Sequence, residues 1–174
     1  YQEMTKAANL RAQTWDRIML LHHAKNEKIR VADREVVSWI ATPPTFSNRG
    51  GFDEGFYRVY TANFLRMSRR EFEEEVRQNL MIEKIRDSMR SKIAVTPEDA
   101  KAFYESETKK WSPPEGGSAT PPASWDSLKK EEKDLFQTLA VEEKTSSEMR
   151  ALLNRLQEKL TLNLEVLDKL LPDE

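Results

Sequence analysis

The sequence predicts an all-α protein of about six to seven helices. The apolar share of the chain, 38%, is low and the charged share, 33%, is high, as in helices with one buried stripe and a charged outer face. Apolar residues return at helical spacing along most of the chain, whereas no segment shows the alternation of a strand. Helix start signals, at Ser68 with Glu71 and at Thr96 with Asp99, precede two of these periodic segments.

The first half of the chain divides into three helices. Residues 7–28 form the first, because apolar side chains recur there every three or four positions. A short second helix follows, with Asp33 as its N-cap, and the proline pair at positions 43 and 44 ends it. A glycine pair at positions 50 and 51 then turns the chain into a third helix, expected over residues 54–65.

Capping signals divide the rest of the chain. The Ser68 and Glu71 pair opens a fourth helix, and Thr96 opens a fifth that runs to about Lys110. Residues 126–143 form the next helix, and a further capping box at Thr145 and Glu148 predicts a new start. The last helix carries one apolar stripe, made of Met149, Leu153, Leu156, Leu160, Leu164, Leu167 and Leu171.

Between the fifth helix and the next lies a segment rich in proline and glycine, WSPPEGGSATPPASW. Its composition is that of a linker. We therefore expect a helical domain over residues 1–111, a linker over 112–125, and C-terminal helices over 126–174 that complete the domain.

The residues needed for catalysis, metal binding or nucleic-acid binding are not combined in any recognisable pattern. The chain has no cysteine, and its two histidines, His22 and His23, are neighbours that point about 100° apart on a helix. Basic residues are interleaved with acidic ones instead of clustered, which disfavours nucleic-acid binding. We expect no catalytic residue, no metal site and no cofactor.

Four ordered blocks carry a family resemblance. They are residues 15–40 (WDRIMLLHHAKNEKIRVADREVVSWI), the loop with Pro44, Phe46, Phe52, Asp53 and Tyr57, then residues 68–85 and 93–107. Over roughly residues 10–107, their order and spacing resemble the N-terminal chaperone domain of the SurA/PpiD family of bacterial envelope folding factors.

The chain departs from the pattern of this family in two places. The second helix of the family opens with Ser or Thr where this chain has Ala32, so the cap must differ. In the family a parvulin prolyl-isomerase domain typically follows the segment that matches residues 103–115, whereas here GGSATPP leads directly to another helix. Isomerase activity is therefore not carried over. Either the chain naturally lacks the domain, or an engineered linker marks where one was excised.

The resemblance implies an ATP-independent chaperone, a holdase, for unfolded exported or outer-membrane proteins in the periplasm. It is either free there or anchored to the membrane by a segment upstream of Tyr1. The C-terminal leucine stripe resembles the helix that returns to the N-terminal domain in this family. Clients would bind an apolar cradle, whose candidate residues are Trp39, Phe46, Phe56, Tyr60, Phe64 and Met67.

Other interpretations remain open at this stage. The candidate rings could instead be core plugs that only fill the interior. The leucine stripe also suits a helical structural or adaptor protein that dimerises through it, and exchange of helices between protomers would give a homodimer of the chaperone as well. A remnant of a peptidyl-prolyl cis-trans isomerase is the enzymatic alternative.

Overall fold

The computed structural model describes residues 2–42, 44–48, 51–112 and 122–159, and in these residues the fold is all-α apart from one short hairpin. The chain divides into two compact units. The first contains the residues up to Ile85 together with the last described turns after Leu152, and the second is Arg86–Leu152. The predicted fold class is confirmed.

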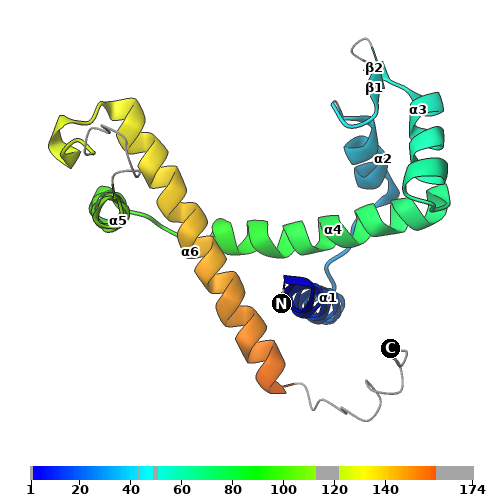
Figure 1. Cartoon of the computed structure of the whole chain (residues 1–174), viewed down its shortest axis with the longest axis horizontal. Coiled ribbons are helices and arrows are strands. Elements are labelled where there is room, and N and C mark those ends of the chain that lie inside the picture. Colours follow the sequence, from blue (N-terminus) through cyan, green and yellow to red (C-terminus); the bar gives the residue numbers. More distant parts are fainter. Residues whose placement is uncertain (1, 43, 49–50, 113–121, 160–174) are drawn as a thin grey trace. The chain divides into compact units, whose positions relative to one another are not determined.

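The first unit contains three helices, a hairpin and most of a fourth helix (Figure 1). Helix α1 is Gln2–Asn26 and α2 is Asp33–Ala41. Strands β1 (Ser47–Asn48) and β2 (Gly51–Phe52) pair antiparallel, with Ser47 opposite Phe52. Helix α3 (Glu54–Val59) continues as a π-helix, η1 (Tyr60–Phe64), and α4 is Arg69–Arg90. In Figure 1, α2, the hairpin and α3 gather around the start of α4.

The second unit contains the end of α4, then α5 (Pro97–Lys109), a 3-10 turn η2 (Trp125–Ser127) and most of α6 (Lys130–Lys159). Tyr104 of α5 is buried and lies edge-on to Phe136 of α6, with 4.6 Å between ring centroids. Its hydroxyl donates a hydrogen bond to the carbonyl of Ala123 at 2.6 Å. Lys144 pairs with Asp99 at 3.0 Å, so α5 and α6 are joined by both apolar and ionic contacts.

Two predicted helix starts, the capping box at Ser68 and the start signal at Thr96, are confirmed. The Glu71 amide donates to Ser68 Oγ at 3.2 Å, and the Ser68 amide donates to Glu71 Oε2 at 2.7 Å, so α4 starts where the sequence predicts. Thr96 and Asp99 exchange the equivalent bonds at 3.2 and 3.0 Å. Pro97 occupies the first position of α5, where no amide donor is needed.

The predicted N-cap of the second helix is wrong by one residue. Ala32, not Asp33, is the N-cap of α2, and its side chain accepts no hydrogen bond. The helix start is closed instead by the Glu35 side chain, which accepts a hydrogen bond from the Ala32 amide at 2.8 Å. Asp33 is thereby free to pair with Arg77 of α4 at 2.8 Å, a tertiary contact that sequence signals alone do not encode.

The predicted helix start at Thr145 is also wrong, because α6 runs without a break from Lys130 to Lys159. Thr145 lies inside it, fully buried, and its hydroxyl donates to the carbonyl of Val141 one turn earlier at 2.7 Å. The start of α6 is instead closed by Glu132, which accepts a hydrogen bond from the Lys129 amide at 2.7 Å. A Thr-x-x-Glu sequence inside a periodic segment is therefore not sufficient to end a helix.

The third helix is predicted in the right place but not in its final form. Asp53 caps α3 by accepting a hydrogen bond from the Phe56 amide at 2.8 Å. Over residues 60–64 the backbone widens to i→i+5 bonding, with the Leu65 amide donating to the Tyr60 carbonyl at 3.1 Å. Arg66 then adopts φ 54°, the left-handed conformation that often ends helices.

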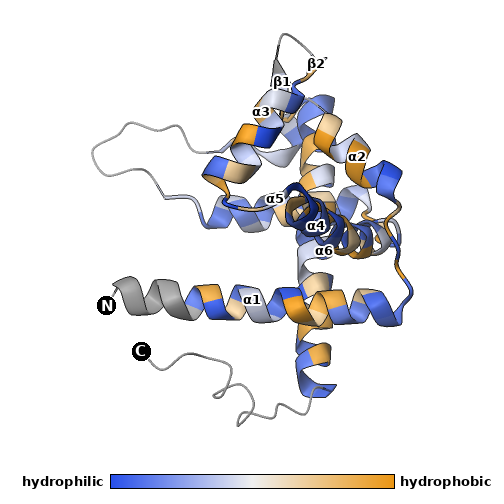
Figure 2. Cartoon of the chain, turned by 90° about the vertical axis from the view of Figure 1, so that its right-hand side faces the viewer, coloured by the Kyte–Doolittle hydropathy of each residue, from blue (hydrophilic) through white to orange (hydrophobic). Residues whose placement is uncertain are grey.

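The core of the first unit is built from α2, the loop before the hairpin, α3 and α4. Figure 2 shows apolar and polar residues alternating along α1, α2 and α3, as expected for helices with one buried side. The core comprises Val31, Val36, Ile40, Phe46, Tyr57 and Val76, with Tyr60, Phe72, Leu80 and Met81 packed against it.

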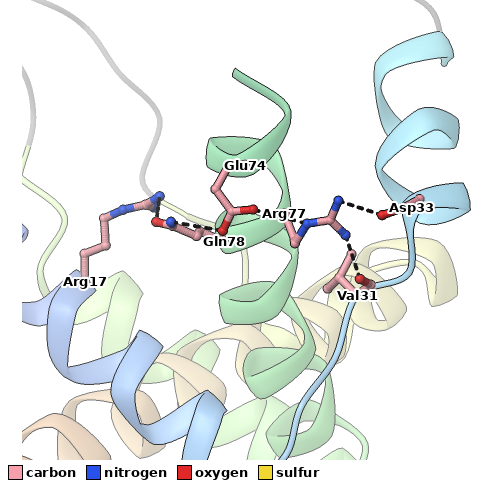
Figure 3. A network of polar contacts seen from close by, with 6 residues as sticks. All are labelled: Arg17, Val31, Asp33, Glu74, Arg77 and Gln78. Carbon is pink, nitrogen blue, oxygen red and sulfur yellow. Dashed lines mark hydrogen bonds and ion pairs between the residues drawn. The ribbon is translucent and has the colours of Figure 1, made fainter. Parts of the chain in front are cut away.

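Two arginines join α4 to the chain segments before it (Figure 3). Arg17 of α1 donates to Gln78 at 3.1 Å and pairs with Glu75 at 2.7 Å. Arg77 donates to the carbonyl of Val31 at 2.8 Å and pairs with Asp33. Both guanidinium groups are largely covered, and the planar fork allows each to hold two partners at once.

The return of the C-terminal helix stays a prediction. Within the stripe, Met149, Leu153 and Leu156 are half-buried, and the turns after Leu152 group with the first unit. The other predicted stripe positions, Leu160, Leu164, Leu167 and Leu171, lie outside the described residues. The predicted domain limits at 111, 125 and 174 likewise stay predictions.

The carboxylates that cap helices predict loss of stability in acid. Hydrogen bonds from Ser68 lower the pKa of Glu71, and those from Lys84 and Ala32 lower that of Glu35. A carboxylate whose pKa is lowered by folding stabilises the folded state at pH values above its ordinary pKa of 4.5. This stabilisation is lost as the pH falls through the pKa of the folded state. We expect the melting temperature to be steady from about pH 7 to about pH 5 and to fall below about pH 4.5.

Thermal denaturation followed by circular dichroism checks this expectation. The matched variant is Glu71→Gln, which keeps an acceptor for the Ser68 amide but has no charge to lose, so its decline in acid should be shallower. A melting temperature that stays constant down to about pH 3 would show that these caps contribute nothing.

Candidate functional site

Three aromatic rings follow one another along α3 and η1, each four residues from the last. Phe56 is 47% exposed, Tyr60 is half-buried and Phe64 is 75% exposed. The rings of Phe56 and Tyr60 lie 5.8 Å apart, and those of Tyr60 and Phe64 are stacked at 5.1 Å with 18° between their planes. We call these three residues the aromatic face. Large exposed rings are costly in water, so their grouping indicates a surface that binds something.

The aromatic face rests on a buried ring. Phe46 is only 2% exposed, and its ring lies 6.1 Å from Phe56 and 5.6 Å from Tyr60. On its other sides it meets Tyr57 at 5.0 Å and Phe72 of α4 at 5.7 Å, both edge-on. Edge-on and tilted pairs at these distances are the favourable arrangements for aromatic rings. The exposed rings are therefore held by packed core and not by a loose loop.

One polar group lies within this aromatic core. The Tyr57 hydroxyl is buried and, among the described residues, has no hydrogen-bond partner of acceptable geometry. Burial raises the pKa of Tyr57, and the negative charge of nearby Glu73 raises it further, so the phenol stays neutral. Glu73 acts on this hydroxyl through its charge but does not meet the geometry of a hydrogen bond.

The π-helical turn is part of the site, since it carries Tyr60 and Phe64. Turns of this kind are rare and occur often at functional positions, because the widened backbone changes the direction of the side chains it carries. Thr61 is fully buried, and its hydroxyl donates to the carbonyls of Tyr57 and Arg58 at 3.0 and 3.1 Å. Thr61 thus lies on the buried side of the segment that carries the aromatic face.

A groove lies along α2 on another side of the first unit. Its apolar walls are Trp39 of α2, 38% exposed, and Leu80 of α4. The groove is open to solvent, with a volume of about 740 Å³. A site of this size accommodates a short stretch of peptide or a small molecule.

A smaller groove of about 430 Å³ lies next to the aromatic segment. Met67, half-buried, forms part of it together with Arg66 and Arg70, and acidic residues of α4 supply the rest. This groove is mixed in charge, so it offers less apolar surface than the aromatic face.

The six predicted site residues do not all meet. Phe46, Phe56, Tyr60 and Phe64 form one continuous set of ring contacts, whereas Trp39 and Met67 line separate grooves. Phe46 is buried in the core, so the interpretation of this ring as a core plug is the right one. The prediction that Phe46 lines the binding surface is wrong, because the ring instead supports that surface from below.

Sequence reasoning missed two contributors to the exposed apolar surface, Val59 and Val37, which are 51% and 63% exposed. Val59 lies between Phe56 and Tyr60 in the sequence, and its place next to Tyr60 could have indicated that it adds to the same apolar surface. Sequence reasoning also missed Arg34, which lines the groove along α2, because a single arginine in a highly charged helix does not stand out in the sequence.

Among the residues that the structure describes, no group of His, Asp and Glu side chains is arranged to hold a metal ion. In that same part of the chain, no helix combines the length and apolar character needed to cross a bilayer. What the structure offers instead is exposed aromatic surface on a helical scaffold.

A comparison with protein-family models places the first half of the chain. Residues 2–86 match the family model described as the SurA-like N-terminal domain. The chain carries a SurA-like N-terminal domain. No curated protein and no solved structure matches the chain. The matched segment includes α1, α2, the hairpin, α3 and all but the end of α4, and hence every predicted site residue.

A SurA-like N-terminal domain is the non-catalytic, chaperone part of a bacterial periplasmic protein family. The described residues between α5 and α6 contain only the turn η2 and no sheet of the parvulin type. The aromatic face and both grooves lie within residues 2–86, the part of the chain that matches the SurA-like N-terminal domain.

Proposed function

We propose that the protein is an ATP-independent holdase that binds apolar segments of unfolded exported or outer-membrane proteins in the periplasm. The observation that carries the proposal is the aromatic face. Phe56 and Phe64 present large exposed rings, yet Phe46 and Tyr60 fix them on a packed core. Such a surface is pre-organised to take up apolar side chains at little cost in ordering.

The expected affinity suits this role. Covering two client aromatic side chains, about 150–250 Å² each, contributes roughly 8–12 kcal/mol at ~25 cal/mol per Å². Association and ordering cost about 4–15 kcal/mol. The remainder is small, so binding is weak and reversible, on the order of micromolar at best. A chaperone without an energy source needs release of this kind.

Suppression of aggregation tests the proposal. An outer-membrane β-barrel protein is diluted from urea into buffer with increasing amounts of the full chain, and light scattering is recorded. We expect scattering to fall progressively as the chain approaches a few-fold molar excess, which follows from micromolar affinity. Scattering that is unchanged at that excess would contradict the proposal.

Dimerisation through the leucine stripe is retained as a separate proposal, because the structure describes only its first part. Sedimentation at several concentrations distinguishes the cases. A monomer at all concentrations removes the dimer and leaves the holdase, whereas a dimer is compatible with both.

A further inference from the structure

The groove along α2 contains an arginine that forms no ion pair with the residues that the structure describes. Arg34 is exposed and lines this groove, and in the described part of the chain its side chain takes part in no ion pair or hydrogen bond. Arg17, Arg69 and Arg77 of the same unit pair with carboxylates, whereas Arg34 and other exposed arginines such as Arg58 pair with none that the structure describes; what distinguishes Arg34 is that it lines this groove. A guanidinium group left free at a groove is available to a ligand.

The acidic neighbour of Arg34 does not neutralise it. Glu35 accepts hydrogen bonds from Lys84 Nζ at 2.7 and 3.0 Å and from the Ala32 amide at 2.8 Å. Lys84 also donates to the carbonyl of Arg30 at 2.8 Å, which fixes the pair in place. The Glu35 carboxylate is thus bonded to Lys84, and Arg34 acts on it only through its charge, so the hydrogen-bond donors of Arg34 remain available to a ligand.

The rest of the groove suits a peptide. Trp39 and Leu80 supply apolar walls, and the hydroxyls of Ser38, Thr42 and Thr45 line it as well. The Thr42 hydroxyl donates to the carbonyl of Ser38 at 2.6 Å. Those of Ser38 and Thr45 make no hydrogen bond to the residues that the structure describes, so both are free to bond a peptide backbone.

We propose that this groove selects client segments in which a carboxylate stands beside an aromatic or large aliphatic side chain. The apolar side chain packs against Trp39 and Leu80, the carboxylate pairs with Arg34, and the backbone bonds to Ser38 and Thr45. This inference rests on the proposed function and adds to it the chemistry of the preferred client segment.

Three short peptides with blocked ends test the inference with the full chain. They share two phenylalanines at fixed spacing and differ only in the residues beside them, which are aspartate, asparagine or lysine. By fluorescence anisotropy, we expect the aspartate peptide to bind about fivefold to tenfold more tightly than the asparagine peptide, and the lysine peptide to bind most weakly. This preference should shrink toward unity in about 0.5 M NaCl, because Arg34 is exposed.

Variants of the groove locate the effect. Arg34→Gln should abolish the preference, so that the aspartate and asparagine peptides bind with equal affinity, and Arg34→Lys should keep part of the preference. Trp39→Ala should weaken binding of all three peptides. The matched control is Arg58→Gln on α3, an exposed arginine outside this groove, which should alter none of the affinities.

Equal affinity for the aspartate and asparagine peptides, or a preference that survives Arg34→Gln, would overturn the inference and leave the holdase proposal intact. Suppression of aggregation without binding of any peptide would also overturn the inference alone. Absence of both peptide binding and suppression would overturn the two together.

Discussion

Replacing Phe46 with alanine should lower the free energy of unfolding by about 3–5 kcal/mol, the usual cost of removing a fully buried phenyl ring. Phe46 is 2% exposed and touches the rings of Phe56, Tyr57, Tyr60 and Phe72. Its loss leaves a cavity at the point where the loop, α3 and α4 meet. Since domains of this size are stable by only about 5–15 kcal/mol, the effect is a large fraction of the total.

Urea denaturation followed by circular dichroism measures this change. The matched control is Phe64→Ala, the same substitution at a ring that is 75% exposed, for which we expect a change within about 0.5 kcal/mol. If both variants lose the same stability, Phe46 does not support the core in the way its contacts indicate.

Replacing Phe56 and Phe64 together with alanine should have the largest effect on client binding. Exposed aromatic anchors commonly contribute about 1–2 kcal/mol each to binding, so their joint loss weakens affinity roughly 30-fold or more. Binding that starts near micromolar then falls to between about 30 μM and about 1 mM, and suppression of aggregation at a few-fold molar excess is largely lost. Most of any loss of stability should come from Phe56, which is about half-buried against Phe46, whereas Phe64 is largely exposed, and the better helix propensity of alanine offsets part of that loss.

The control for this prediction is a second pair of exposed apolar residues on another helix. Leu135 and Leu139 of α6 are 56% and 40% exposed and are also four residues apart. Their replacement with alanine removes comparable apolar surface away from the aromatic face, so suppression should be retained. Equal loss of suppression in the two double variants would mean that general hydrophobicity, and not the aromatic face, binds clients.

The helices of this protein could be predicted because their signals are local. The Ser68 and Thr96 capping boxes depend on residues three positions apart, and both are present as expected. Prediction failed where a distant contact decided the outcome. Asp33 lies inside α2 and pairs with Arg77 of α4, and Thr145 is buried inside α6 with its hydroxyl on the Val141 carbonyl, and the sequence near these residues shows neither environment. The β1–β2 hairpin was not predicted, because strands of two residues are too short to show an alternation of apolar and polar residues.

In the candidate site, too, the features set by local spacing could be predicted, and those set by distant contacts could not. Spacing of four residues placed Phe56, Tyr60 and Phe64 on one side of a helix, and the structure brings these rings together. The burial of Phe46 depends on how the loop after α2 folds onto α3 and α4, which no periodicity describes. The donors of Arg34 remain available because Lys84, far along the chain, is bonded to Glu35.

Site-specific photo-crosslinking tests the central claim most directly. A photoreactive phenylalanine analogue is placed at Phe64 on the aromatic face or, in a separate variant, at Leu135 on α6, and each chain is mixed with an unfolded outer-membrane protein and irradiated. We expect efficient crosslinking to the client from position 64 and little from position 135, although both side chains are exposed. Equal yields from the two positions, or a yield confined to position 135, would contradict the assignment of the aromatic face as the client-binding surface.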